Sequence, residues 1–421
     1  MFDIFSLPEF KMPENFLWGS GYAGHQVEGN NKNSQNWKRE IELKYKEKSG
    51  MACNSYELWK TDVDLAEQAG LQVFRTSVEW SRIEPCEGHF DQKAAGHYVA
   101  MFAELKTRGI KVFVTLVHFT HPQWFQELGH FTKLENRKYF ERYLEFIVPL
   151  IAPYVDFWNV INEFNLGNTA QQVKFKLASV RFHALGYHII KKYSDKPVSS
   201  AHALVQYMPK RPFDRWDRVM AEYDDLRDHE FFFHAIRTGE VLYPFKEGVY
   251  APEVKDTADF WSVNSYVRDM IDARRAGGKG ERFEFKQMKM IPKNFYLEEF
   301  NPECIINNLS RLTDKPVYIT ENGVCCNDDR FRIIFISEYL SAVHEAIKLG
   351  VDVKGYLYWS MLDNYEWNSF LPRFGLYNVD FNSFERTPKP SRDFYREIIK
   401  QNGINQKLIR SYLNEVPSLK K

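Results

Sequence analysis

Two glutamates follow short apolar runs and could act together on one bond. Glu321 closes the run at residues 316–323 (PVYITENG), whose Val, Tyr, Ile and Thr favour a β-strand. Glu163 closes residues 157–163 (FWNVINE) in the same way. A single strand-terminal glutamate is as well explained by a surface ion pair. Two of them fit cleavage of a glycosidic bond, in which one carboxyl group protonates the leaving oxygen and the other attacks or activates water.

The two runs belong to an alternation of short strand-like segments and longer helical patterns, which is typical of a parallel sheet. Helices are expected at residues 54–69, 94–108, 134–152, 173–193, 228–238, 302–312 and 337–349. Eight segments have strand character, at residues 16–23, 73–80, 111–119, 157–163, 197–204, 260–266, 316–323 and 355–362. Together they predict an α/β protein with a closed (β/α)8 TIM barrel, in which catalytic groups lie at the C-terminal strand ends.

An open doubly wound sheet is the alternative fold. It would place a glycine-rich turn before a helix to hold phosphate, but Gly19, Gly21 and Gly24 are followed by HQVEG, which has no helical pattern. We predict one barrel domain over residues 1–421. Residues 272–282 (DARRAGGKGER) are polar and aperiodic, and are expected to form a flexible loop.

Composition narrows the class of partner. The 56 basic and 56 acidic side chains give no net charge, so nothing indicates a nucleic-acid or anionic membrane partner, and a small neutral substrate is compatible. The five cysteines are odd in number and lack CxxC spacing, which argues against a disulfide framework and favours a reducing compartment. The N-terminal segment lacks the pattern of a signal peptide, and no apolar stretch is long enough to span a membrane. We therefore expect a cytoplasmic protein.

Polar and aromatic residues also gather where the other predicted strands end. If the barrel is right, these side chains face one pocket, in which they would surround the two glutamates. The set consists of Gln26, Glu28, Arg75, Glu79, His118, Asn162, Asn264, Tyr266, Trp359, Glu366 and Trp367.

Each member of this set also has a structural explanation. Tryptophans pack cores more often than they bind ligands. His118 and His121 have a spacing that could suggest a metal pair, yet no nearby carboxylate completes a ligand set, so a metal-dependent hydrolase is a disfavoured alternative. A buried Arg75 would need an acidic partner, and beside Glu321 it would hold that carboxyl group ionised.

The motifs together resemble glycoside hydrolase family 1, the β-glucosidase and β-galactosidase family, over nearly the whole chain. The INE of residues 161–163 resembles the acid/base motif, and the ITENG of residues 319–323 resembles the nucleophile motif. Further matching segments are FLWGSGYAGHQVEG, FRTSVEWSRIEP, WSMLDNYEW and RFGLYNVDF. Any one of these would be a weak signal, whereas the set is highly specific.

The resemblance implies a (β/α)8 barrel that cleaves β-glycosides with retention of configuration. It makes Glu321 the nucleophile and Glu163 the general acid/base, with their carboxyl groups about 5 Å apart. It makes Arg75, Asn264 and Tyr266 the supports of Glu321. It assigns the sugar to Gln26, His118, Asn162, Trp359, Glu366 and Trp367. No metal or organic cofactor is needed, the partner is a small β-glycoside or short oligosaccharide, and homo-oligomerisation stays open.

The chain departs from the family pattern on the leaving-group side. Phe164 replaces the usual Pro, residues 118–121 read HFTH instead of HWDLP, and the loops after Glu163 and Trp367 are short. These differences leave the preferred leaving group open. A carboxylate at Glu366 would repel a 6-phosphate, so we expect activity on unphosphorylated sugars. The two strand-end glutamates within the set of family motifs lead us to expect an exo-acting enzyme. A non-catalytic sugar-binding protein is the alternative, disfavoured because both glutamates are present.

Overall fold

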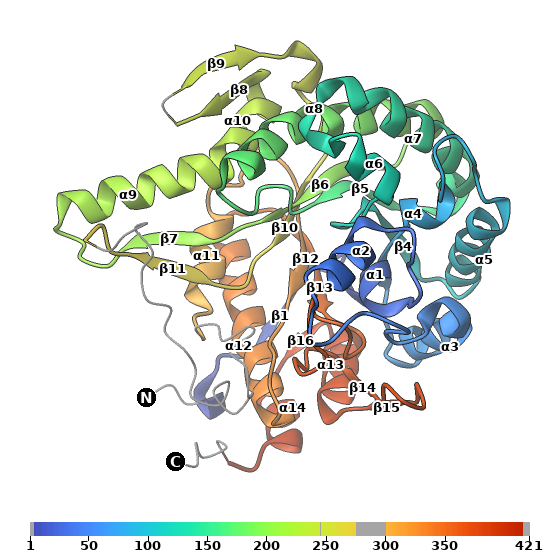
Figure 1. Ribbon diagram of the computed structural model, residues 1–421. Coiled ribbons are helices and arrows are strands. Elements are labelled where there is room, and N and C mark those ends of the chain that lie inside the picture. The colour runs from blue at the N-terminus through green and yellow to red at the C-terminus, as the bar shows by residue number, and fades with distance from the viewer. Residues whose placement is uncertain (1–3, 245, 275–299, 416–421) are drawn as a thin grey trace.

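The computed structural model describes residues 4–244, 246–274 and 300–415. Eight parallel strands close into a barrel surrounded by helices (Figure 1), which confirms the predicted (β/α)8 fold and shows that the open-sheet alternative is wrong. In order around the barrel the strands are β2 (Leu17–Gly21), β3 (Val73–Ser77), β4 (Lys111–Val117), β5 (Phe157–Asn162), β6 (Val198–Ala203), β10 (Trp261–Asn264), β12 (Val317–Asn322) and β13 (Val353–Trp359). Each overlaps one of the eight predicted segments.

The barrel interior changes from apolar to polar along the strands. Toward the N-terminal ends of the strands, Phe113, Phe157 and Phe260 pack together in one cluster with Val73 and Leu357. Alternate residues of a strand face the same side, so two residues further along each strand comes the next inward layer. That layer is polar and internally hydrogen-bonded, through Arg75 to Thr115 and Asn159 to Ser262. Apolar side chains therefore fill the barrel near the N-terminal ends of its strands, and polar side chains follow toward the C-terminal ends.

Helices cover the outside of the barrel. The main ones are α3 (Ser55–Gln68), α5 (Gln92–Thr107), α7 (Arg137–Ile151), α8 (Ala170–Tyr193), α10 (Phe231–Thr238), α11 (Glu303–Leu309), α12 (Asp329–Lys348) and α13 (Pro390–Gln401). The prediction placed the start of α12 eight residues too late. Asp328 begins this helix by accepting a hydrogen bond from the backbone N–H of Arg330.

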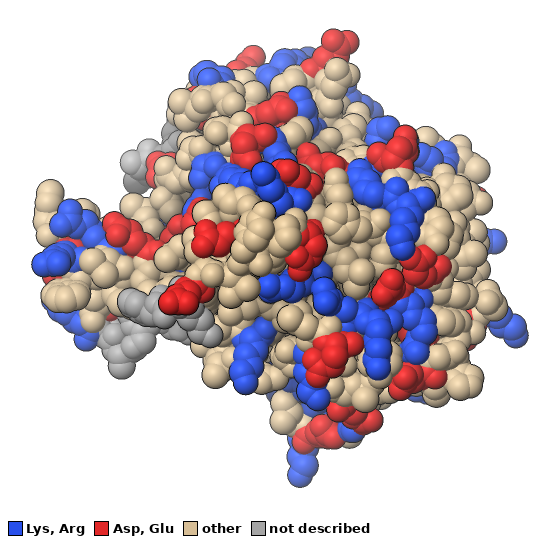
Figure 2. All heavy atoms as spheres, turned by 90° about the horizontal axis from the view of Figure 1, so that it is seen from above, with Lys and Arg blue, Asp and Glu red and all other residues tan. Residues whose placement is uncertain are grey.

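An arm built from segments that follow β6 and β10 was not predicted. It contains β7 (Gln206–Pro209), α9 (Arg215–Asp225) and β11 (Arg268–Ile271), with β7 and β11 paired in parallel. It projects from the barrel at the left of Figures 1 and 2. A hairpin of β8 (Glu240–Tyr243) and β9 (Lys246–Tyr250) lies near α10. Of the loop predicted at residues 272–282, residues 275–282 lie outside the described part of the chain.

The surface reflects the equal numbers of basic and acidic residues in the sequence. Figure 2 shows basic and acidic side chains intermixed over the face seen from above. Within the described ranges, no helix is both long enough and apolar enough to cross a membrane.

Candidate active site

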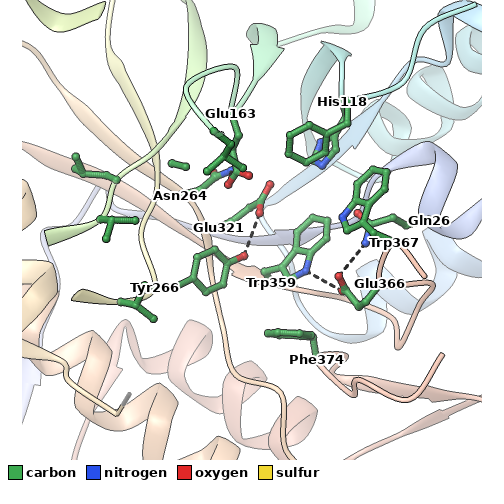
Figure 3. Close-up of a pocket in the computed structure, with 16 residues that line it drawn as sticks. Gln26, His118, Glu163, Asn264, Tyr266, Glu321, Trp359, Glu366, Trp367 and Phe374 are labelled. Atoms are coloured by element: carbon green, nitrogen blue, oxygen red, sulfur yellow. Dashed lines mark hydrogen bonds between the residues drawn. The ribbon is translucent and has the colours of Figure 1, made fainter. Parts of the chain in front are cut away.

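A cavity of about 260 Å³ opens where the barrel strands end (Figure 3). Nine of the eleven site residues predicted from the sequence line it: Gln26, His118, Glu163, Asn264, Tyr266, Glu321, Trp359, Glu366 and Trp367. The other two, Arg75 and Asn162, are buried and contact lining residues. The structure therefore brings these eleven residues to one place, although the strands that carry them are spread along the chain. Glu28 and Glu79 were also expected to face the pocket, but they do not line it; Glu28 instead accepts hydrogen bonds from Arg82 and Tyr98.

Glu321 is fixed by two donors. One carboxyl oxygen accepts from Arg75 at 2.5 Å, and the other accepts from the Tyr266 hydroxyl at 3.0 Å. Arg75 is 2% exposed, and its guanidinium also donates to the Thr320 carbonyl and to Asn162. Burial raises the pKa of the Glu321 carboxyl, and Arg75 is the strongest influence that lowers it. The predicted pairing of Arg75 with Glu321 is present, and it partly offsets the effect of burial on the pKa of Glu321, which remains raised.

Glu163 follows β5 directly and points toward Glu321 across the cavity (Figure 3). Its φ is +46°, in the left-handed region that few non-glycine residues adopt, and its backbone N–H donates to Ala201 at 2.7 Å. Phe119 and Trp367 also line the cavity and have φ of +65° and +58°. Unusual backbone conformations of this kind cluster at functional sites, where they aim side chains.

One asparagine links the two carboxyl groups. The Asn264 side-chain amide donates to Glu163 at 2.8 Å and to Asn162 at 3.2 Å, and it also contributes a hydrogen bond that lowers the pKa of Glu321. The amide is held because its carbonyl oxygen accepts from the Thr320 hydroxyl at 2.8 Å. Asn264 therefore helps to fix the positions of the Glu163 and Glu321 carboxyl groups relative to each other.

Glu366 lies on the side of the cavity opposite Glu163 (Figure 3). Its carboxyl oxygens accept from the side chains of Gln26, at 3.1 Å, and Trp359, at 3.3 Å. Burial, with a smaller contribution from the nearby Glu321, raises the pKa of Glu366 to about 8. The Gln26 side-chain oxygen is buried and has no hydrogen-bond partner among the described residues, so it is available to a ligand.

The pKa of Glu366 predicts how stability depends on pH. Since the folded-state pKa of about 8 exceeds the ordinary value of 4.5, the folded protein holds a proton that the unfolded chain releases. This stabilisation is complete below the unfolded pKa and is lost as pH rises through about 8. Urea unfolding should show that the wild-type protein loses at least about 1 kcal/mol more than Glu366→Gln between about pH 6 and about pH 9. Parallel losses in the two proteins would contradict this assignment.

Aromatic rings form one wall of the cavity. His118 lies parallel to Trp359 and to Trp367, with ring centroids 6.0 and 6.2 Å apart, and His25 lies parallel to Trp367 at 6.0 Å. Burial and the nearby Arg75 hold the pKa of His118 well below its usual range, so its ring is neutral. Flat rings beside convergent polar groups match the apolar faces and hydroxyl edges of a sugar.

His121 does not join His118 in a metal site. Its ring contacts Gln126 at 2.9 Å and stacks near His130, and it is absent from the cavity lining. Within the described ranges, no group of three or more His, Cys, Asp or Glu side chains is placed to hold a metal ion.

Sequence reasoning named Glu79 without finding its role. This carboxylate is 1% exposed and accepts from the His25 backbone N–H at 3.0 Å, from Asn31 at 2.7 Å and from Thr120 at 2.7 Å. It ties the loop after β2, which carries Gln26, to the loop after β4. The prediction missed further lining residues that share no chemical motif: Phe119, Leu166, Ala203, Leu204, Val205, Val267 and Phe374.

The fold and the site are those of a class of hydrolases with a (β/α)8 barrel. In this class, two carboxyl groups lie close together in a pocket that has aromatic walls and the size of a sugar. A sequence model described as glycosyl hydrolase family 1 matches residues 9–404, and the chain belongs to this family. It is 28% identical to a 6-phospho-beta-galactosidase of Leptotrichia buccalis, over 92% of this chain and 98% of the relative.

Two solved structures extend the comparison. The beta-glycosidase from Pyrococcus horikoshii is 32% identical, with a TM-score of 0.85, and the match covers 96% of this chain and 98% of that one. The family 1 b-glucosidase from Thermotoga maritima is 24% identical with a TM-score of 0.86, covering 94% and 99% of the two chains, and supports the fold alone.

Proposed function

We propose that the protein is a retaining exo-β-glycosidase that removes the non-reducing-end sugar from unphosphorylated β-glycosides. The observation that carries the proposal is the pair of opposed carboxyl groups, Glu163 and Glu321, in one cavity with different surroundings. Glu321 is paired with the Arg75 guanidinium, and Glu163 accepts a hydrogen bond from the neutral Asn264 amide. A volume of about 260 Å³ suits a single sugar ring, which supports exo action.

In the first step, an ionised Glu321 oxygen attacks the anomeric carbon while Glu163 donates its proton to the leaving oxygen. The bond from the anomeric carbon to the leaving oxygen breaks, and an ester to Glu321 forms. Arg75 and Tyr266 favour the ionised form of Glu321 and orient its oxygens. Attack removes the charge that Arg75 had paired.

In the second step, Glu163 acts as the base. Its carboxylate takes a proton from water, the water oxygen bonds to the anomeric carbon, and the ester to Glu321 breaks. Two displacements at one carbon restore the original configuration. A carboxyl separation of about 5 Å is expected for this course.

The other lining groups would hold the sugar. The unpartnered oxygen of Gln26 can accept from a hydroxyl, and Glu366 can bind an adjacent one. The Trp359 ring offers a face for the sugar carbons, and Asn162 and His118 contact each other at 3.3 Å beside it. These roles need no metal and no organic cofactor.

Curated relatives at 28% identity are 6-phospho-beta-galactosidases, so the phosphorylation state of the substrate needs its own argument. Our sequence argument relied on a negative Glu366, but its raised pKa leaves that group neutral below about pH 8. The preference for unphosphorylated sugars is instead supported by the charges of the residues that line the cavity. Among the described residues that line the cavity, three are Glu and none is Lys or Arg. A phosphate dianion would enter without a lining cation to replace its lost water.

The test is a panel of 4-nitrophenyl α- and β-glycosides with matched 6-phosphorylated forms. We expect turnover of β-glycosides only, with kcat/KM for the best unphosphorylated sugar at least about a hundredfold above that for its 6-phosphate. Preference for the phosphate would overturn this part of the proposal. Sugar binding without turnover of any glycoside would instead favour the non-catalytic alternative. The predicted cytoplasmic location stays a prediction.

A further inference from the structure

The outer end of the arm exposes three neighbouring apolar side chains, which we call the apolar tip. Phe213 is 97% exposed and Val219 is 42% exposed. Trp216 is 65% exposed, and it is the one exposed tryptophan among the residues that the structure describes. Trp216 and Val219 lie three residues apart on α9 and so share one face of the helix, and Phe213 lies just before the helix begins. Single exposed apolar side chains are normal, whereas a group of them marks an interaction surface.

The apolar tip is placed where it can reach another surface. Strand β7 leads outward from the barrel and α9 returns toward it, so residues 210–216 lie at the far end of the arm (Figure 1). Figure 2 shows basic and uncharged side chains together at this end. The barrel therefore does not block the approach of a broad, flat partner.

The orientation of α9 is the reverse of that of an ordinary surface helix. Its buried residues are Asp217, Ala221 and Asp224, and Asp217 accepts from the Arg211 side chain at 2.6 Å. A surface helix normally turns its apolar residues inward and its charged residues toward water. Here buried polar contacts hold the helix to the arm, while the large apolar side chains face solvent. A partner that covered the apolar tip would remove this unfavourable exposure.

Unpaired cations accompany the apolar tip. Residues 210–218 contain four basic and two acidic side chains. Both acids are engaged within the arm, because Asp214 caps the start of α9 and Asp217 forms the buried pair described above. Arg215 and Arg218 are exposed, and neither forms an ion pair with another described residue. The end of the arm therefore offers free positive charge beside apolar rings.

We propose that the apolar tip docks the protein onto an anionic lipid surface. Phe213 and Trp216 would enter the headgroup layer, where aromatic rings are favoured, and Arg215 and Arg218 would lie beside lipid phosphates. The sequence analysis expected no membrane partner because it used the net charge of the whole chain, whereas the charge at the end of the arm is local. Docking of this kind requires no segment that crosses the bilayer, and it is independent of the proposed glycosidase function.

A second copy of the chain fits the apolar tip less well. A stable protein interface buries about 800 Å² on each partner, whereas two aromatic side chains and a valine supply roughly 500 Å². A symmetric contact between two tips would also bring the unpaired arginines together, and like charges oppose association. A lipid surface supplies negative charge and requires no shape complementarity.

The test is sedimentation of the full-length protein with phosphatidylcholine vesicles, with and without phosphatidylglycerol. The wild-type protein should bind the anionic vesicles at least about tenfold more tightly than the neutral ones, and about 0.5 M NaCl should remove most of this difference. Phe213→Ser combined with Trp216→Ser should lower the affinity for both kinds of vesicle by at least about tenfold. Arg215→Gln combined with Arg218→Gln should lower only the affinity for anionic vesicles, by about tenfold.

Leu43→Ser combined with Leu349→Ser is the matched control, because these leucines are 59% and 69% exposed elsewhere on the surface. The control should leave vesicle binding unchanged, and every variant should keep the wild-type unfolding midpoint because the replaced side chains are exposed. Absence of wild-type binding, or equal binding by the tip variants, would overturn the proposal. A wild-type dimer that the tip variants disrupt, or tip-dependent binding of a single-stranded oligonucleotide, in either case without vesicle binding, would also overturn it.

Discussion

Replacing Glu321 with Ala lowers kcat for a 4-nitrophenyl β-glycoside by at least about 10⁴-fold, because the variant lacks the carboxyl group that Arg75 and Tyr266 hold in position for attack. The loss reflects chemistry, so a small external nucleophile should replace the missing oxygen. Azide is expected to restore part of the rate and to give the glycosyl azide of inverted, α configuration.

The azide product separates this explanation from misfolding. A misfolded protein gains nothing from azide, whereas an empty nucleophile position gains a product of defined configuration. A Glu321→Ala variant with wild-type kcat would remove Glu321 from the mechanism. Rescue that gave the β azide would place the nucleophile elsewhere.

Replacing Glu163 with Ala has an effect that depends on the leaving group. A poor leaving group needs protonation, so kcat/KM for an alkyl β-glycoside should fall by about 10²–10⁴-fold. A 2,4-dinitrophenyl β-glycoside leaves without a proton, so its first step should persist and the glycosyl-enzyme should accumulate as a burst. Azide should then speed the second step and give the retained, β azide.

The contrast between substrates is the control in this experiment. Loss of a merely structural residue slows both substrates alike, whereas loss of the acid spares the activated one. Equal slowing of the two glycosides, or an α azide from Glu163→Ala, would contradict the role of Glu163 as acid and base.

The barrel strands were predictable because they are buried on both faces and end abruptly in polar residues. In β4 and β5 nearly every residue is buried, so each reads as one apolar run that ends beside a functional group. The arm was missed because its elements lack such signals. Its strand β7 is half-buried and ends at Pro209, and α9 is rich in charged residues. Long-range packing, and not local pattern, gives these segments their structure.

The membership of the site was predictable, but its electrostatics were not. Glu163, Glu321 and Arg75 follow from strand ends and motifs in the sequence. The link through Asn264 and the raised pKa of Glu366 depend on residues brought together from different strands, and the left-handed backbone at Glu163 has no local sequence signal.

The stereochemistry of the wild-type reaction tests the central claim most directly. Proton NMR of a β-glycoside reaction in D₂O, recorded before the released sugar equilibrates, shows which anomer forms first. Two carboxyl groups acting as nucleophile and acid/base predict that the β anomer appears first and the α anomer only later, by mutarotation. First appearance of the α anomer would mean a single displacement by water, and would contradict a covalent role for Glu321.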